Sequence, residues 1–252
     1  MAFNSNKYPL IDDSFIFRGP FTCLIAGPSG SGKTELLKEI LKYKEIMITP
    51  QPIKKIVYCY AVWQKAYDEI KGVEWHENLP EGELVDFFGG DSGHNILILD
   101  DLMQEAENDQ RLLKLFTKDS HHANISVFFI SQNLFSQNKH SRTIALNAHY
   151  LIIFKNPRDM SQIAFLGRQM YPHASKFLTE AYEDAVEETP FGYLFIDLKS
   201  STHKRYRIQT GIIPNQKRFV YIPTQSDTIF CLCYITKSII AIISTLLYIY
   251  YV

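Results

Sequence analysis

Residues 27–34 have the sequence Gly-Pro-Ser-Gly-Ser-Gly-Lys-Thr, in which a glycine and four further residues precede Gly-Lys-Thr. The run before it, Phe-Thr-Cys-Leu-Ile-Ala at 21–26, is apolar enough to predict a buried strand. The run after it, 33–45, predicts a helix with an apolar face made of Leu36, Leu37, Ile40 and Leu41. Strand, glycine-rich loop and helix together form the context that indicates a P-loop.

A P-loop binds phosphate groups through its backbone. Its glycines let the N–H groups point inward, and the helix start adds the positive end of a dipole. Lys33 is expected to contact the β- and γ-phosphates of a nucleotide, and Thr34 is expected to bind magnesium. The alternative, a glycine-rich turn without a nucleotide, does not account for the agreement of loop, Lys-Thr pair and flanks. The expected nucleotide-binding residues are Gly27, Pro28, Ser29, Gly30, Ser31, Gly32, Lys33 and Thr34.

Length and composition bound the class of protein. The chain has 252 residues, of which 46% are apolar, enough for one large α/β domain and too apolar for a disordered protein. The formal net charge is −1 at pH 7, so nucleic-acid binding must depend on a local basic surface. The N-terminus lacks the apolar core of a secretory signal. The four cysteines show neither zinc-ligand spacing nor a disulfide framework, which predicts a reducing, intracellular compartment.

A second informative stretch is Asn-Ile-Leu-Ile-Leu-Asp-Asp at 95–101. Four consecutive aliphatic residues predict a central parallel strand, and two carboxylates follow at its C-terminal end, where α/β sheets bind ligands. This is a Walker B pattern. Asp100 is the expected magnesium residue, and Asp101 is expected to orient or deprotonate the attacking water. An acidic pair without a P-loop upstream would more often be a turn or a helix cap.

A third run, 125–130, predicts a buried strand that ends in Ser-Gln-Asn at 131–133. Gln132 is expected either to contact the γ-phosphate or the attacking water, or to satisfy loop backbone. A basic loop is predicted at 139–142. A turn with helix-start character, Asn-Pro-Arg-Asp, follows at 156–159. The other predicted elements are strands over 56–60, 149–154, 192–198 and 205–212, helices over 63–71, 105–118, 161–170 and 173–188, and a short helix ending at 89–90.

The C-terminal part has two unusual stretches. No acid occurs from 198 to 226, where the basic residues either face nucleic-acid phosphates or make a solubilising edge hairpin: Lys199, Lys204, Arg205, Arg207, Lys217 and Arg218. Residues 229–252 are almost wholly apolar, but the part after Lys237 is shorter than the about 20 residues of a membrane span. This tail is an anchor, a buried element or an appendage. We expect a lead-in over 1–20, a P-loop domain over 21–224 and the tail over 225–252.

The glycine loop, Ile-Leu-Ile-Leu-Asp-Asp-Leu at 96–102 and Phe-Phe-Ile-Ser-Gln-Asn at 128–133 together resemble genome-packaging ATPases of the FtsK–HerA superfamily. The resemblance is especially to those of adintoviruses, Maverick/Polinton elements and poxviruses. The stretches at 142–150 and 154–159 strengthen it, and it covers about residues 14–215. It implies an α/β P-loop NTPase with a mostly parallel central sheet flanked by helices. The two strands over 192–212 add a C-terminal β-hairpin.

The resemblance further implies an oligomeric ring that uses ATP and Mg²⁺ to pump double-stranded DNA into a capsid, with ATP bound between subunits. Lys33 and Thr34 match the Walker A residues, Asp100 and Asp101 the Walker B acids, and Gln132 the polar sensor. Such rings use an arginine from the neighbouring subunit. Arg142 is the first candidate for it and Arg168 the second. The expected location is intracellular, either virus-associated or in the host nucleus or cytoplasm.

Two other classes of protein stay open at this point. A small-molecule P-loop kinase would need an acceptor pocket and an arginine-rich lid, and no arginine cluster of that kind is evident. A membrane-tethered nucleotide switch is suggested by the apolar tail, which would then contact the membrane.

Overall fold

The computed structural model describes residues 5–10, 15–88, 93–102, 109–116, 123–135 and 139–224, and only the backbone of 5, 86, 113 and 139–142. The apolar tail predicted over 225–252 lies outside these ranges. Within them, the chain contains no helix with the length and apolar character needed to cross a bilayer.

The described residues form a ten-stranded sheet in the order β1-β12-β11-β10-β9-β3-β8-β7-β5-β6. Strands β2 (Phe17–Arg18) and β4 (Ile48–Thr49) pair separately as a small parallel sheet. The bounds of the main strands are β1 Ser5–Pro9, β3 Thr22–Ala26, β5 Ile53–Tyr60, β6 Glu74–Glu77, β7 His94–Asp100, β8 Ile125–Ser131, β9 Tyr150–Phe154, β10 Tyr193–Asp197, β11 Ile208–Thr210 and β12 Phe219–Pro223.

The strands from β9 to β6 are parallel to one another, and this part of the sheet positions the site. Strands β3, β7, β8 and β9 are buried at every residue, as expected for strands covered on both faces. Because parallel strands end at one edge, the residues that follow β3, β7, β8 and β9 meet there. The P-loop, Asp101 and Gln132 all lie at this edge.

The other four strands are antiparallel. Strand β10 pairs with β9 and β11, and β12 pairs with β11 and β1. This confirms the predicted C-terminal hairpin and extends it by strands that the sequence did not predict. Its second strand is shorter than expected, because residues Lys204–Tyr206 form a 3₁₀ helix. At the sheet edge, Lys7 of β1 makes an ion pair with Asp184 at 2.8 Å.

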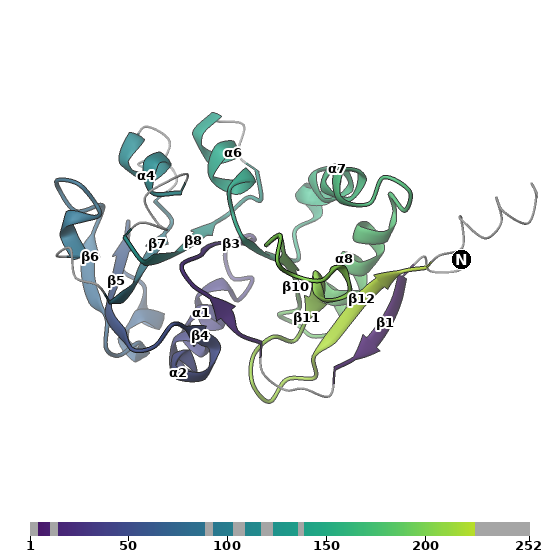
Figure 1. Cartoon of the computed structure of the whole chain (residues 1–252), viewed down its shortest axis with the longest axis horizontal. Coiled ribbons are helices and arrows are strands. Elements are labelled where there is room, and N and C mark those ends of the chain that lie inside the picture. Colours follow the sequence, from purple (N-terminus) through teal and green to yellow (C-terminus); the bar gives the residue numbers. More distant parts are fainter. Residues whose placement is uncertain are drawn as a thin grey trace, which may run out of the picture.

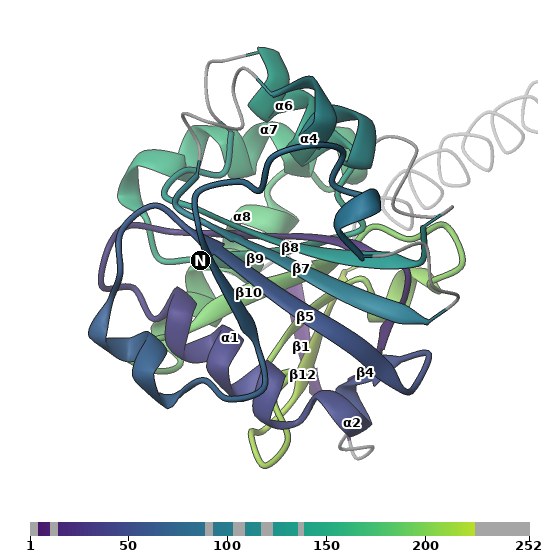
Figure 2. The same cartoon turned by 90° about the vertical axis from the view of Figure 1, so that its left-hand side faces the viewer.

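Helices cover both faces of the sheet (Figures 1 and 2). Helices α1 and α2 pack on one face, against an aromatic cluster that includes Phe17, Phe21 and Phe128. Helices α4, α6, α7 and α8 pack on the other. The helix bounds are α1 Lys33–Lys42, α2 Lys44–Met47, α4 Gln110–Lys114, α6 Lys139–Leu146, α7 Met160–Met170 and α8 Phe177–Glu187. The α/β fold with a mostly parallel sheet is therefore as predicted.

Several local predictions need correction. The basic loop predicted at 139–142 is the first turn of α6, since the helix is held through buried Ile144 and Ala145, which lie beyond the polar run. The helix predicted over 63–71 is a 3₁₀ helix, Lys65–Glu69, and the one ending at 89–90 is another, Asp86–Phe88. Of the helix predicted over 105–118, the described part contains α4.

Candidate nucleotide-binding site

The P-loop connects β3 to α1 at the centre of the sheet. Its first N–H, from Gly27, donates to the carbonyl oxygen of Ser131 at 3.1 Å, which ties the loop to the end of β8. At its other end, Gly32 precedes α1 without any side-chain cap on the helix. The first N–H groups of a helix have no partner within the helix. The start of α1 therefore offers backbone donors and a positive dipole end to an anion.

Two aromatic side chains line the loop so closely that glycine is required. A Cβ atom on Gly27 would lie 2.7 Å from Cβ of Phe154. Gly32 has φ of 101°, a left-handed conformation, and its Cβ would lie 3.2 Å from Cβ of Phe191. Phe191 itself is 62% exposed beside the loop. Sequence reasoning did not single out either phenylalanine, because their approach to the loop depends on tertiary packing.

Two side chains of the loop indicate an anion site. Nζ of Lys33 donates to the carbonyl oxygens of Gly27 at 2.6 Å and Pro28 at 2.9 Å. Burial lowers the pKa of Lys33, and the negative charges of Asp100 and Asp101 oppose this shift. The hydroxyl of Ser31 is buried and has no hydrogen-bond partner among the described residues. An unsatisfied buried hydroxyl costs about 1–3 kcal/mol, which a phosphate oxygen would recover.

Asp100, the last residue of β7, is held by two tyrosine hydroxyl groups. Tyr58 donates to its Oδ2 at 2.6 Å and Tyr67 donates to the same oxygen at 2.7 Å. Burial raises the pKa of Asp100, whereas the two hydrogen bonds and the charge of Lys33 lower it. With both hydroxyl groups on Oδ2, the Oδ1 atom has no hydrogen bond to a described residue.

The two tyrosines were not predicted from the sequence. Tyr58 lies on β5, the strand beside β7, and Tyr67 lies in the 3₁₀ helix that follows. Both pack against Trp75, with the rings of Tyr67 and Trp75 stacked at 5.2 Å. The tyrosine-rich strand was a signal in the sequence for Tyr58. Nothing in the spacing relates Tyr67 to Asp100.

Asp101 and Gln132 are brought together. Nε2 of Gln132 donates to Oδ1 of Asp101 at 3.1 Å, and both residues are exposed. Asp101 has φ of 56°, a left-handed conformation that turns the chain directly after β7. The preceding Ser131 is buried, and its hydroxyl donates to the carbonyl oxygen of Asn133 instead. Gln132 is therefore the side chain of this strand end that reaches the second acid.

The residues present fit a magnesium ion. Thr34, the second residue of α1, offers a hydroxyl oxygen, and Asp100 offers Oδ1. Mg²⁺ prefers such oxygen ligands and is usually held by one or two protein groups together with phosphates and water. The two predicted metal residues thus lie on the helix that starts the phosphate site and on a strand that ends at the same edge.

Arg142 and Arg168 are the two arginines predicted to act on the nucleotide of a neighbouring subunit. Arg142 lies in α6, but its side chain is outside the described part of the structure. Arg168 is exposed on α7, with its guanidinium carbon 5.8 Å from the ring centre of Phe165. The Asn-Pro-Arg-Asp segment forms a 3₁₀ turn after β9. There Asn156 accepts from the N–H of Arg158 at 3.1 Å and donates to buried Asp159 at 2.9 Å.

Comparison with protein families identifies the chain. The model of the family described as "Poxvirus A32 protein" matches residues 11–176, which is more than half of the chain. The chain belongs to the poxvirus A32 protein family. The matched part includes the P-loop, both Walker B acids and Gln132. The resemblance to the poxvirus type of packaging ATPase is thereby confirmed. No curated protein is significantly similar in sequence.

Several solved structures have a similar fold. The genome packaging NTPase B204 from Sulfolobus turreted icosahedral virus 2, in complex with ATP-gammaS, has 16% identity and a TM-score of 0.48, covering 75% of this chain and 96% of that one. The DNA-packaging ATPase B204 from Sulfolobus turreted icosahedral virus has 16% identity and a TM-score of 0.48, covering 81% and 98%.

A bacterial structure is also similar. The cytoplasmic domain of the type VII secretion ATPase EccC from Thermomonospora curvata has 12% identity and a TM-score of 0.49, covering 81% of this chain and 25% of that one.

Proposed function

We propose that the chain is a Mg²⁺-dependent ATPase that translocates double-stranded DNA and packages a viral or virus-like genome into a capsid. The observation that carries the proposal is the convergence, at one edge of the parallel sheet, of the P-loop, Asp100 and the Asp101–Gln132 pair. Membership of the poxvirus A32 protein family supports it. We assign the activity to a domain over 21–224.

Different groups of the site have different roles in the proposed phosphoryl transfer. The N–H groups at the start of α1 and the ammonium group of Lys33 bind the phosphates and neutralise their charge. Thr34 and Asp100 would hold the magnesium ion, which neutralises charge on the phosphate oxygens when bound. Asp101 accepts a proton from the attacking water or orients it, and Gln132 fixes the carboxylate for that purpose.

Assembly is part of the proposal. A ring of subunits would place an arginine of one copy against the nucleotide of the next, with Arg142 as the first candidate and Arg168 as the second. Loops at the pore would push the phosphate backbone of DNA without reading its bases. Capsid proteins are the expected further partners. The expected location is intracellular, either virus-associated or in the host nucleus or cytoplasm.

The decisive experiment is steady-state ATP hydrolysis with and without double-stranded DNA, combined with a triplex-displacement assay for translocation. Wild type is compared with Lys33→Ala and with Lys65→Ala, which removes an exposed lysine from the 3₁₀ helix after β5. We expect DNA-stimulated hydrolysis and triplex displacement in wild type and Lys65→Ala, and neither in Lys33→Ala. Hydrolysis at the same rate with and without DNA would contradict the proposed DNA translocation. No hydrolysis under either condition would contradict the proposed ATPase activity.

A further inference from the structure

Phe191 is an exposed phenylalanine beside the phosphate site, and the proposed reaction gives it no role. It lies two residues before β10, which is antiparallel to β9, so the start of β10 and the end of β9 share one edge of the sheet. The P-loop follows β3 at this same edge, since β3 and β9 are parallel. Phe191 is 62% exposed there. A large apolar ring is thus presented to solvent next to the site for the phosphates.

A tight turn fixes the position of this ring. The N–H of Gly192 donates to the carbonyl oxygen of Thr189 at 3.0 Å, which closes a four-residue turn with Pro190 at its second position. Proline suits this position because its ring fixes φ. From the turn, the side chain of Phe191 reaches the loop, where a Cβ atom on Gly32 would lie 3.2 Å from both its Cβ and its Cδ1. The ring therefore stands against the start of α1.

The order of the strands puts Phe191 and the γ-phosphate on opposite sides of the P-loop. Along the sheet this order is β10-β9-β3-β8-β7. Asp101 and Gln132 follow β7 and β8, on one side of β3, whereas Phe191 precedes β10, on the other side. In the proposed reaction the γ-phosphate faces Asp101 and Gln132. The nucleoside part of the nucleotide then extends from the loop toward β9 and β10, where the ring of Phe191 is exposed.

The chemistry of the side chain indicates what it would bind. A phenylalanine ring offers a flat apolar face and no hydrogen-bonding group. Bases stack on such rings irrespective of their identity, because every base has a π-face. Covering the ring with a base would also remove apolar surface from water, which is favourable. A ring at this place favours a nucleotide over a free phosphate chain without selecting adenine.

We propose that Phe191 binds the base of ATP by stacking, and that this contact accepts the base of any nucleoside triphosphate. The inference rests on the proposed function, which places the triphosphate at the P-loop. It assigns base binding to the turn before β10, which lies beyond residues 11–176 that the family model matches.

The test compares ligands with and without a base. Binding of AMPPNP, GMPPNP and inorganic tripolyphosphate is measured by isothermal titration calorimetry with Mg²⁺, on wild type, Phe191→Ala and Phe191→Trp. The alanine variant keeps the Cβ atom that lies nearest the loop. We expect it to weaken binding of both nucleotides about tenfold, with less than about a twofold effect on tripolyphosphate, which has no base to stack. Phe191→Trp should bind the nucleotides at least as tightly as wild type, because it restores a ring.

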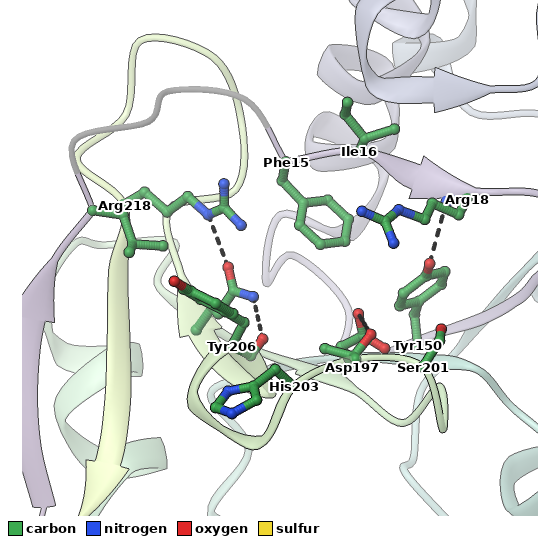
Figure 3. Close-up of a pocket in the computed structure, with 12 residues that line it drawn as sticks. Phe15, Ile16, Arg18, Tyr150, Asp197, Ser201, His203, Tyr206 and Arg218 are labelled. Carbon is green, nitrogen blue, oxygen red and sulfur yellow. Dashed lines mark hydrogen bonds between the residues drawn. The ribbon is translucent and has the colours of Figure 1, made fainter.

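The matched control is Tyr206→Ala. It removes a 47% exposed ring from the opposite edge of the sheet, where Tyr206 lines a separate pocket (Figure 3). Tyr150 of the same pocket begins β9 and pairs with Cys23 near the start of β3, whereas the P-loop follows the other end of β3. This variant should bind all three ligands as wild type does.

The possible outcomes separate the base contact from the ATPase. Equal losses for the nucleotides and tripolyphosphate in Phe191→Ala would overturn the proposal, because the ring would then support the loop and not contact a base. Unchanged nucleotide binding in this variant would overturn it as well. A loss for AMPPNP without a loss for GMPPNP would contradict a contact that accepts any base. ATP hydrolysis by wild type is measured separately, so binding that depends on Phe191 without hydrolysis would contradict only the proposed ATPase.

Discussion

Gln132 donates a hydrogen bond through Nε2 to Oδ1 of Asp101 at 3.1 Å, which joins the ends of β8 and β7. The two residues are far apart in sequence and were predicted separately as the sensor and the water-activating acid. Because the amide fixes one carboxylate oxygen, the other is left to accept from water. The pair thus behaves as one unit in the proposed reaction.

That coupling predicts non-additive kinetics. Asp101→Asn should lower kcat about 10²–10⁴-fold, since general-base catalysis contributes that much. Gln132→Ala should lower it about tenfold, the effect of losing one hydrogen bond to a charged group. The double variant should be no slower than Asp101→Asn alone. Steady-state ATPase assays measure this, with Asn133→Ala as the exposed neighbouring control. Multiplied losses in the double variant would show that the residues act independently.

Removing one of the two hydroxyl groups that donate to Asp100 should change the pH dependence of ATP hydrolysis. The bond from Tyr67 favours the charged carboxylate and lowers its pKa, so Tyr67→Phe raises a pKa that burial already raises. The acid limb of the pH–rate profile should therefore shift to higher pH. The magnesium concentration for half-maximal activity at neutral pH should rise.

The matched control is Tyr60→Phe, in the same aromatic cluster but without a hydroxyl contact to a described residue. It should leave the profile in place. If the acid limb of the pH–rate profile does not shift in Tyr67→Phe, the ionisation of Asp100 does not determine that limb.

Gly32→Ala tests whether the loop needs its left-handed turn beside Phe191. The positive φ should destabilise the fold by about 1–2 kcal/mol, and the added Cβ would also press on Phe191. We expect ATP binding to fall at least tenfold by isothermal titration calorimetry. Gly82→Ala has a similar φ of 80° with open space around the Cβ, so it should show the stability loss with normal ATP binding. Normal binding in Gly32→Ala would show that the loop tolerates a Cβ.

Asn156→Ala should destabilise the domain by about 1–3 kcal/mol at neutral pH, because it removes the side-chain amide donor to the buried Asp159 carboxylate and leaves it the backbone N–H of Leu134. Burial raises the folded-state pKa of Asp159 above the unfolded value, and losing the donor raises it further. The charged carboxylate then penalises folding as the pH rises through that pKa. The difference in the free energy of unfolding between variant and wild type should therefore become smaller at lower pH.

Urea unfolding at several pH values measures this difference, with exposed Asn133→Ala as the reference. If the difference in the free energy of unfolding does not change with pH, the destabilisation comes from the turn and not from Asp159.

Strong local patterns made much of the fold predictable. The continuous aliphatic runs that end in Asp100 and Ser131 are typical of strands that are buried on both faces. The glycine loop before Lys33 is recognised from adjacent residues alone. Predictions were weaker where the pattern was polar. The sequence predicts a loop where α6 has its first turn, because the helical state of this turn depends on packing by Ile144 and Ala145 further along the chain.

The sequence by itself determined the P-loop, the strand that carries Asp100 and Asp101, and the parallel α/β class, because contiguous residues carry these signals. Tertiary structure decided which distant groups meet. Tyr67 reaches Asp100, Phe191 lines Gly32, and Arg18 faces Arg218 through strand order and packing. The physical reason is that hydrogen bonds and charge interactions act over a few ångströms in space, whereas sequence patterns report only neighbours along the chain.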